Sequence, residues 1–124
     1  MAKQNKPLYP HSGIDHPLWL QVDGQIVFHK IVLFLKDRGS WNDAYYELVS
    51  SAAGSYQNYV SAQKQINELG VIVPTASGDG IRQNPAIPIA SSNFRDFMTF
   101  SNKFGLNPLF DNKVKTGDNE DSEI

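Results

Sequence analysis

The 124-residue sequence contains no cysteine. Disulfides and thiolate metal sites are therefore excluded, and the absence fits a reducing compartment. No apolar run approaches the roughly 20 residues that a membrane-spanning helix needs, and residues 1–13 lack the apolar region of a signal peptide. These absences predict one soluble, cytosolic domain that has no contact with a membrane.

A strong excess of one charge is also missing, since 11 basic and 13 acidic residues give a net charge of −2. Four of the acids lie in residues 116–124, so the rest of the chain holds 11 basic and 9 acidic residues. A single copy this weakly basic would hold DNA poorly, because phosphate neutralisation supplies most non-specific affinity. We predict a flexible basic arm (1–13), one domain (14–115) and a disordered acidic tail (116–124).

Catalytic motifs are absent as well. No serine stands in a nucleophile elbow, and the segment from Ser77 to Gly80 suits a turn because it lacks the lysine of a phosphate-binding loop. His11, Asp15 and His16 carry metal-ligating atoms, but their spacing matches no strong metal site. We expect His29 to be a packed or surface histidine. The sequence thus predicts a protein that is not an enzyme and has neither metal nor cofactor.

The first predicted helix covers residues 25–38 and is followed by Gly39. Its apolar residues occupy more than one face, which indicates burial on two sides, against a neighbouring helix or another subunit. Lys36 and Arg38 fall in its last turn, where cations suit the helix dipole. Before it, residues 14–22 are expected to form a short turn that packs three apolar side chains onto the body: Leu18, Trp19 and Val22.

A second, longer helix is predicted to run as far as residue 69, with Ser40 opening a capping box that Asp43 closes. Gly54, in its middle, indicates close packing, a kink or a break into two helices. The segment carries few charges for its length. Contact with protein on both sides would explain this pattern and favours an oligomer.

A hairpin and a last helix follow. Gly70 suits the left-handed end of a helix, and residues 71–75 are expected to pair with residues 81–83. Asn84 and Pro85 are typical of a helix N-terminus, and Gly105 of a helix end. The predicted buried face of this last helix comprises Ile87, Ala90, Phe94, Phe97, Met98, Ser101 and Phe104.

Direct signals for nucleic-acid binding are modest. A helix, a turn containing Gly39 and a second helix give the outline of a helix-turn-helix, but packed helical hairpins share that outline and the second helix carries almost no base. The candidate DNA contacts are basic residues of the helices and of the arm: Lys30, Lys36, Arg38, Lys64, Lys3 and Lys6.

The order of the signals is more specific than any one of them. Over roughly residues 26–110, the succession E-L-G-V-I-V, Q-N-P-A and F-G-L-N-P resembles the small terminase subunits of tailed double-stranded DNA phages. Five residues carry the resemblance and are expected to set backbone geometry: Gly70, Asn84, Pro85, Gly105 and Pro108. The resemblance implies a mainly α fold, with a helical hairpin, a small β-hairpin and a C-terminal helix, that assembles as an oligomer.

The resemblance also implies a function. Such a subunit is non-catalytic, forms a homo-oligomeric ring, binds double-stranded viral DNA in the cytoplasm of the bacterial host, and directs or regulates the large terminase subunit, which holds the ATPase and nuclease. Two alternatives stay open from the residues: a helical adaptor or virion assembly protein without DNA contact, and a small helix-turn-helix regulator. The acidic tail would contact the large subunit or the portal, or serve solubility alone.

Overall fold

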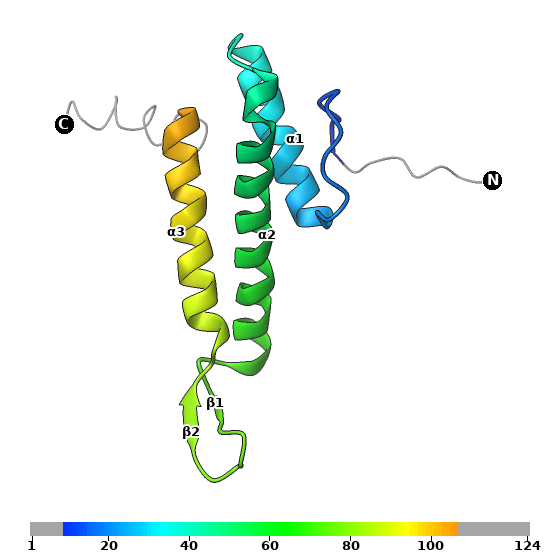
Figure 1. Ribbon diagram of the computed structural model, residues 1–124. Coiled ribbons are helices and arrows are strands. Elements are labelled where there is room, and N and C mark those ends of the chain that lie inside the picture. The colour runs from blue at the N-terminus through cyan, green and yellow to red at the C-terminus, as the bar shows by residue number, and fades with distance from the viewer. Residues whose placement is uncertain (1–8, 107–124) are drawn as a thin grey trace, which may run out of the picture.

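The computed structural model of the protein describes residues 9–106 and is built around one long central helix (Figure 1). That helix, α2, packs against α1 on one side and against α3 on another, and a two-stranded hairpin joins α2 to α3. The predicted fold class, mainly helical with a small β-hairpin, is confirmed. In chain order the elements are α1 (Val22–Asp37), the 3₁₀ turn η1 (Asp43–Tyr45), α2 (Tyr46–Leu69), β1 (Ile72–Pro74), β2 (Ile81–Gln83) and α3 (Ala86–Phe104).

Helix α1 begins three residues earlier than the sequence predicted. Gly24 lies inside it and is buried, and a Cβ at this position would stand 2.7 Å from Leu20 Cδ2. Glycine therefore allows a close approach that a larger residue would block. At the other end Gly39 has a φ of 72°, and the Ser40 N–H donates to the Leu35 carbonyl at 2.8 Å, so the helix stops in a left-handed cap as expected.

The start of α2 differs from the predicted capping box. Asn42, and not Ser40, supplies the cap: its side-chain oxygen accepts a hydrogen bond from the Ala44 N–H at 2.8 Å and opens η1, which leads into α2. Gly54 neither kinks nor breaks the helix. A Cβ on Gly54 would lie 3.0 Å from the ring of Trp19, so close packing is the reason for this glycine.

The hairpin leaves α2 at Gly70, which has a φ of 90°. Its two strands are antiparallel, with Val73 opposite Arg82, in agreement with the predicted pairing. Helix α3 then ends at Gly105, in the left-handed region, where the Leu106 N–H donates to the Ser101 carbonyl at 2.8 Å. The chain therefore returns along α2 in the opposite direction and brings the end of α3 close to the end of α1 (Figure 1).

Burial divides the molecule into two regions. In the first, which we call the three-helix end, α1, the first half of α2 and the second half of α3 enclose large side chains such as Phe28, Leu35, Val49 and Phe97. In the second, the stalk, only the later half of α2 and the first half of α3 meet. Their contact is a seam of small residues, Ala62, Ala86 and Ala90.

Several residues predicted to be buried are exposed. Phe94 and Met98 are 43% and 36% exposed, because α3 packs mainly against α2 and the apolar stripe of α3 is wider than that contact. Leu18, Trp19 and Val22 are also exposed, while the buried residue of their segment is Leu20. The segment has no helical periodicity to indicate which side chain points inward. No helix in residues 9–106 is long and apolar enough to cross a membrane.

Candidate functional site

The predicted basic residues at the end of α1 lie where α1 and α3 finish together. The Arg38 guanidinium donates to the Gly105 carbonyl at 3.1 Å and lies 5.0 Å from the centre of the Phe34 ring. The Lys36 ammonium donates to the Ser12 carbonyl at 2.7 Å. Both cations therefore serve contacts within the chain, although each side chain remains exposed to solvent.

The other predicted cations are spread out. Lys64 pairs with Asp23 at 3.7 Å, at the opposite end of α1 from Lys36, a separation of about 20 Å along the helix axis. Lys30 is exposed on α1, with Asp23 and Asp37 seven residues away on either side and hence on the same face. Lys3 and Lys6 lie outside the described residues. Lys36 and Arg38 are thus both at the end of α1 but point to different sides of the helix, towards Ser12 and Gly105, and Lys64 is not close to either.

Lys103, which the sequence did not indicate as a site residue, lies at the same end of the molecule. It lines a cavity of about 240 Å³ with Ser40 and Tyr45. Only the fold brings it there, because the contact between Arg38 and Gly105 joins residues 67 positions apart. Asp37, Asp43 and Glu47 belong to the same end, so three carboxylates balance the charge of the three cations and a single copy has no excess positive charge there.

Along the stalk, two grooves flank the alanine seam. The first, the apolar groove, has a volume of about 270 Å³ and contains no charged residue; its lining includes Tyr59, Gln63, Ile66, Ile87, Ser91 and Phe94. Tyr59 and Phe94 contact each other across it, with ring centres 5.1 Å apart. Helical spacing extends the same stripe of α3 to Met98. This side of the stalk is therefore an uncharged and partly exposed surface.

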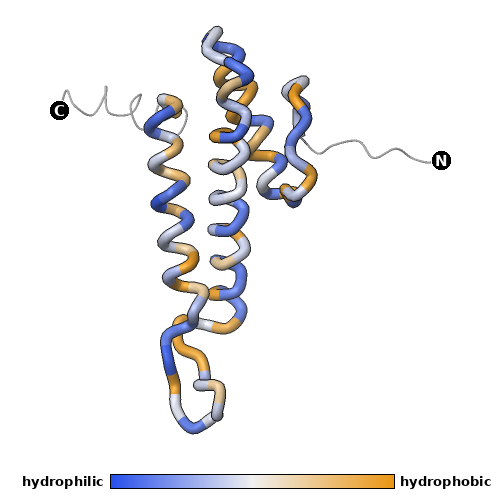
Figure 2. Tube along the Cα trace, in the orientation of Figure 1, coloured by the Kyte–Doolittle hydropathy of each residue, from blue (hydrophilic) through white to orange (hydrophobic). Residues whose placement is uncertain are grey.

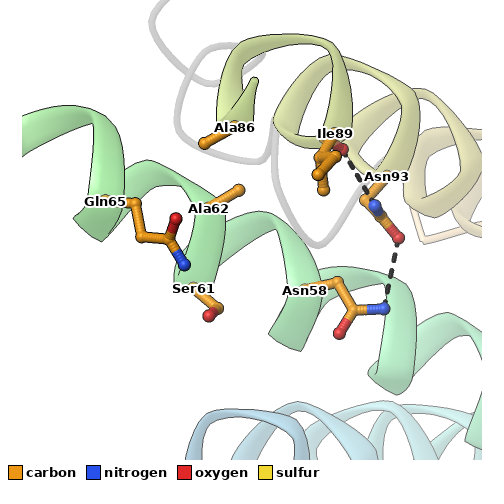
Figure 3. A pocket seen from close by; sticks show the side chains of 7 residues that line it. All are labelled: Asn58, Ser61, Ala62, Gln65, Ala86, Ile89 and Asn93. Atoms are coloured by element: carbon orange, nitrogen blue, oxygen red, sulfur yellow. Dashed lines mark hydrogen bonds between the residues drawn. The ribbon is translucent and has the colours of Figure 1, made fainter. Parts of the chain in front are cut away.

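The second groove is polar (Figure 3) and is lined on α2 by Asn58, Ser61 and Gln65. Asn93 from α3 accepts a hydrogen bond from the Asn58 amide at 3.5 Å and donates to the Ile89 carbonyl at 2.8 Å. The two sides of the stalk thus differ in chemistry.

Asn84 fixes the junction between stalk and hairpin. The residue is buried; its side-chain amide donates to the Gly70 carbonyl at 2.8 Å, and its side-chain oxygen accepts from the Ala86 N–H at 2.9 Å. The Asn84 N–H donates to the Val71 carbonyl as well. One side chain therefore joins the end of α2 to the start of α3, and Pro85 follows it with a helical φ of −63°. Pro108 lies outside the described residues.

The histidines lie near the start of the described chain. His29 is a packed residue of α1 with no exposed surface. The His11 ring lies 4.3 Å from it, and His16 Nδ1 stands 2.9 Å from His29 Nε2. Burial first, then the charges of His11 and His16, lower the pKa of His29 from 6.5 to about 4, against an opposing effect of Asp15. Residues 9–106 contain no group of three potential ligands that could hold a metal ion.

Comparison with known families shows to which family the chain belongs. Residues 24–121 match the family described as "Phage terminase, small subunit". The chain belongs to the phage terminase small subunit family. Small terminase subunits act in phage DNA packaging and are in general the non-catalytic partner of the large subunit. No curated protein and no solved structure matches this small terminase subunit.

Proposed function

We propose that this small terminase subunit binds double-stranded viral DNA, assembles into a homo-oligomeric ring, and directs or regulates the large terminase ATPase and nuclease in the host cytoplasm. Membership of the family carries the proposal. The fold is consistent with it, since a subunit that acts by binding needs surfaces for partners. The apolar groove and the cation-bearing ends of α1 and α3 are two such surfaces.

The apolar groove is the surface that we assign to self-association. Ile87, Phe94 and Met98 follow one stripe of α3 at spacings of seven and four residues, and this stripe lies beside the Tyr59 and Ile66 side chains of α2. Apolar surface of this kind is the main source of binding energy between subunits. Figure 2 shows that apolar residues continue past the stalk along β1, where Ile72 is 56% exposed. Another copy of the chain is the occupant that the proposed ring requires.

Light scattering tests the ring. We expect a closed oligomer many times heavier than the 13.8 kDa chain. Phe94→Arg should shift it towards monomer, because an unpaired charge would be buried at the interface. Ser92→Arg adds the same charge on an exposed position of α3 outside the stripe and should leave the mass unchanged. A monomer at micromolar concentration for the unmodified protein would count against the proposal.

DNA binding would depend on assembly. The three cations and three carboxylates near the ends of α1 and α3 leave one copy without net positive charge there, so several copies must bind together to hold a duplex. Phosphate contacts by Lys30, Arg38 and their equivalents in each copy would release counterions. The affinity should therefore fall steeply as the salt concentration rises.

A pair of double variants tests the location of the DNA contacts. Replacing Lys30 and Arg38 by alanine should weaken binding and reduce the slope of log affinity against log salt by about 2 per subunit engaged. Replacing Arg82 and Arg95 removes the same charge from β2 and from another part of α3, and should leave the slope unchanged. Equal losses in both variants would contradict the assignment to α1. Lys36 is kept in both, since its contact with Ser12 also positions the N-terminal residues.

One observation favours the alternative of an adaptor or virion assembly protein without DNA contact. Residues 9–106 contain 7 Lys and Arg residues against 8 Asp and Glu residues, and Lys36, Arg38 and Lys64 are engaged within the chain. An oligomer that binds no DNA even at low salt would favour this function. A helix-turn-helix regulator would instead give a dimer that recognises a palindromic site.

A further inference from the structure

His29 lies at the centre of the contact between α1 and the residues that precede it. Its Nδ1 atom is 3.1 Å from the Ser12 backbone nitrogen and 2.8 Å from the Ser12 hydroxyl. Its Nε2 atom is 2.9 Å from His16 Nδ1. The Tyr9 ring stacks on the imidazole with centres 5.3 Å apart. Both ring nitrogens of a fully buried side chain are therefore used to hold one segment of the chain.

These contacts fix where the protons are. A backbone N–H can only donate, so His29 Nδ1 must accept from Ser12 and carries no proton. A neutral imidazole then has its proton on Nε2, which donates to His16 Nδ1. His11 follows the same rule, because its Nδ1 accepts from the Gly13 N–H at 2.9 Å. The arrangement is satisfied only while His29 is neutral, since a proton on its Nδ1 would remove the bond from the Ser12 N–H and place two donors in contact.

The remaining attachments of the segment are to the body of the protein. Lys36 donates to the Ser12 carbonyl, and the Tyr46 hydroxyl of α2 donates to the Asp15 carbonyl at 3.0 Å. Tyr9 donates to the Gln25 side chain at 2.8 Å. The charged or titratable groups that face His29 from the elements around it are thus His11, Asp15, His16, Tyr9, Lys36 and Tyr46. Among the bonds to the segment, the one that a proton on His29 abolishes is the bond from the Ser12 N–H to His29 Nδ1.

We propose that His29 is an acid-releasable anchor that holds residues 9–16 on α1 and so fixes the point at which residues 1–8, with Lys3 and Lys6, join the body. Protonation of His29 at Nδ1 would remove the acceptor of the hydrogen bond that the Ser12 N–H donates. It would also leave a buried imidazolium beside two other histidines. Release exposes that cation to water and separates it from His11 and His16. Release also frees the Lys36 ammonium to contact DNA. That consequence rests on the proposed function, whereas the release itself does not.

The sign of the pH effect follows from the pKa of His29, which is lowered from 6.5 to about 4 while the segment is attached. The released state binds the proton more readily, so attachment is strongest above about pH 6.5 and weakens as the pH falls. The equilibrium constant for release should rise by up to tenfold per pH unit between about pH 6.5 and about pH 4. Below about pH 4 both states are protonated, and no further increase is expected.

Nuclear magnetic resonance of the full chain tests the anchor directly. At pH 7.5 the ¹⁵N shifts of His29 should show an unprotonated Nδ1 and a protonated Nε2. Hydrogen-exchange protection of the Ser12 amide, corrected for the intrinsic rate, should fall at least tenfold between pH 7.5 and pH 5, while protection of the Ala52 amide in the buried part of α2 stays constant. The opposite tautomer at pH 7.5, or constant Ser12 protection, would overturn the proposal.

Two variants separate the anchor from its surroundings. His29→Asn keeps an acceptor close to the position of Nδ1 but cannot titrate, so Ser12 protection should become independent of pH. His11→Asn removes a neighbouring histidine that makes no hydrogen bond to His29, and the pH dependence should persist. A pH dependence that survives His29→Asn would overturn the proposal. Should that variant not fold, the tautomer and exchange measurements on the unmodified chain still decide.

Discussion

The three-helix end and the stalk use the same kinds of residue in opposite places. In the three-helix end, phenylalanine, leucine and valine form most of the interior. In the stalk the inside is alanine, whereas Ile89 and Phe94, among others, lie outside and are 51% and 43% exposed. Small residues let two helices approach closely without hiding large side chains between them. The first region is thus stabilised by its own core, whereas the second keeps large apolar side chains exposed, which is what the proposed self-association requires.

The strongest test of this difference between the two regions is a matched pair of alanine substitutions in α3. Phe97 is 4% exposed and lies 5.2 Å, centre to centre, from the Tyr56 ring. Phe97→Ala should lower the free energy of unfolding by about 4 kcal/mol, because it leaves a cavity in the three-helix end. Phe94→Ala should cost less than about 1 kcal/mol in the monomer, since the ring is already in contact with water.

Urea unfolding at a concentration where both variants have the same assembly state measures the difference between these two substitutions. Equal losses would mean that the stalk and the three-helix end share one core, and the division of the molecule into two regions would be wrong.

A smaller effect is expected at the junction of the stalk and the hairpin. Asn84→Ala removes the hydrogen bonds to the Gly70 carbonyl and the Ala86 N–H, and it leaves both groups without that partner in a buried site. We expect a loss of about 2 kcal/mol. Amide exchange should accelerate at Ala86 and along the hairpin before it does so in α1.

The control for this variant is Asn67→Ala, at an exposed position near the end of α2, which should be almost neutral. If the Asn84 and Asn67 variants unfold alike, Asn84 does not hold the junction.

The smallest effect concerns hydroxyls inside the three-helix end. Ser50 and Ser101 are buried, and their side-chain oxygens have no hydrogen-bond partner among the described residues. Ser101→Ala should raise the free energy of unfolding by about 1 kcal/mol, because an unpaired hydroxyl no longer has to be desolvated. Ser92→Ala makes the same change in helix propensity at an exposed position of α3, so the difference between the two melting curves isolates burial. A destabilised Ser101 variant would reveal a partner for that hydroxyl.

The sequence was sufficient wherever local chemistry decides the structure. Gly39, Gly70 and Gly105 lie at helix ends with positive φ angles, and the hairpin pairs as its β-branched residues and turn indicate. The prediction from local chemistry was wrong at Ser40, because the side chain that caps the next turn belongs to Asn42. The apolar periodicity of α3 was also read correctly as a stripe, but periodicity does not say whether the partner of that stripe belongs to the same chain. Phe94 and Met98 therefore appeared to be core residues.

The candidate sites depended more on the fold than on the sequence. Arg38 lies close to Gly105, and Lys103 therefore lies close to the end of α1, because three helices meet there. No spacing of residues along the chain predicts this proximity. The sequence left open whether His29 is packed inside or lies on the surface, because the residues that cover it come from an irregular segment. The family, in contrast, could be inferred from the order of the turn and cap residues alone.

The length of helix α2 also sets the distance between the three-helix end and the hairpin. Its 24 residues run without interruption from the three-helix end to the hairpin, a length of about 36 Å. Each residue added would lengthen it by about 1.5 Å and rotate everything beyond the insertion by about 100°. A single insertion would therefore turn the apolar groove away from the direction that it now faces, while seven residues added to both α2 and α3 would lengthen the stalk by about 10 Å and nearly restore that direction. The spacing and the angular phase of the two ends are thus set by the number of residues between them.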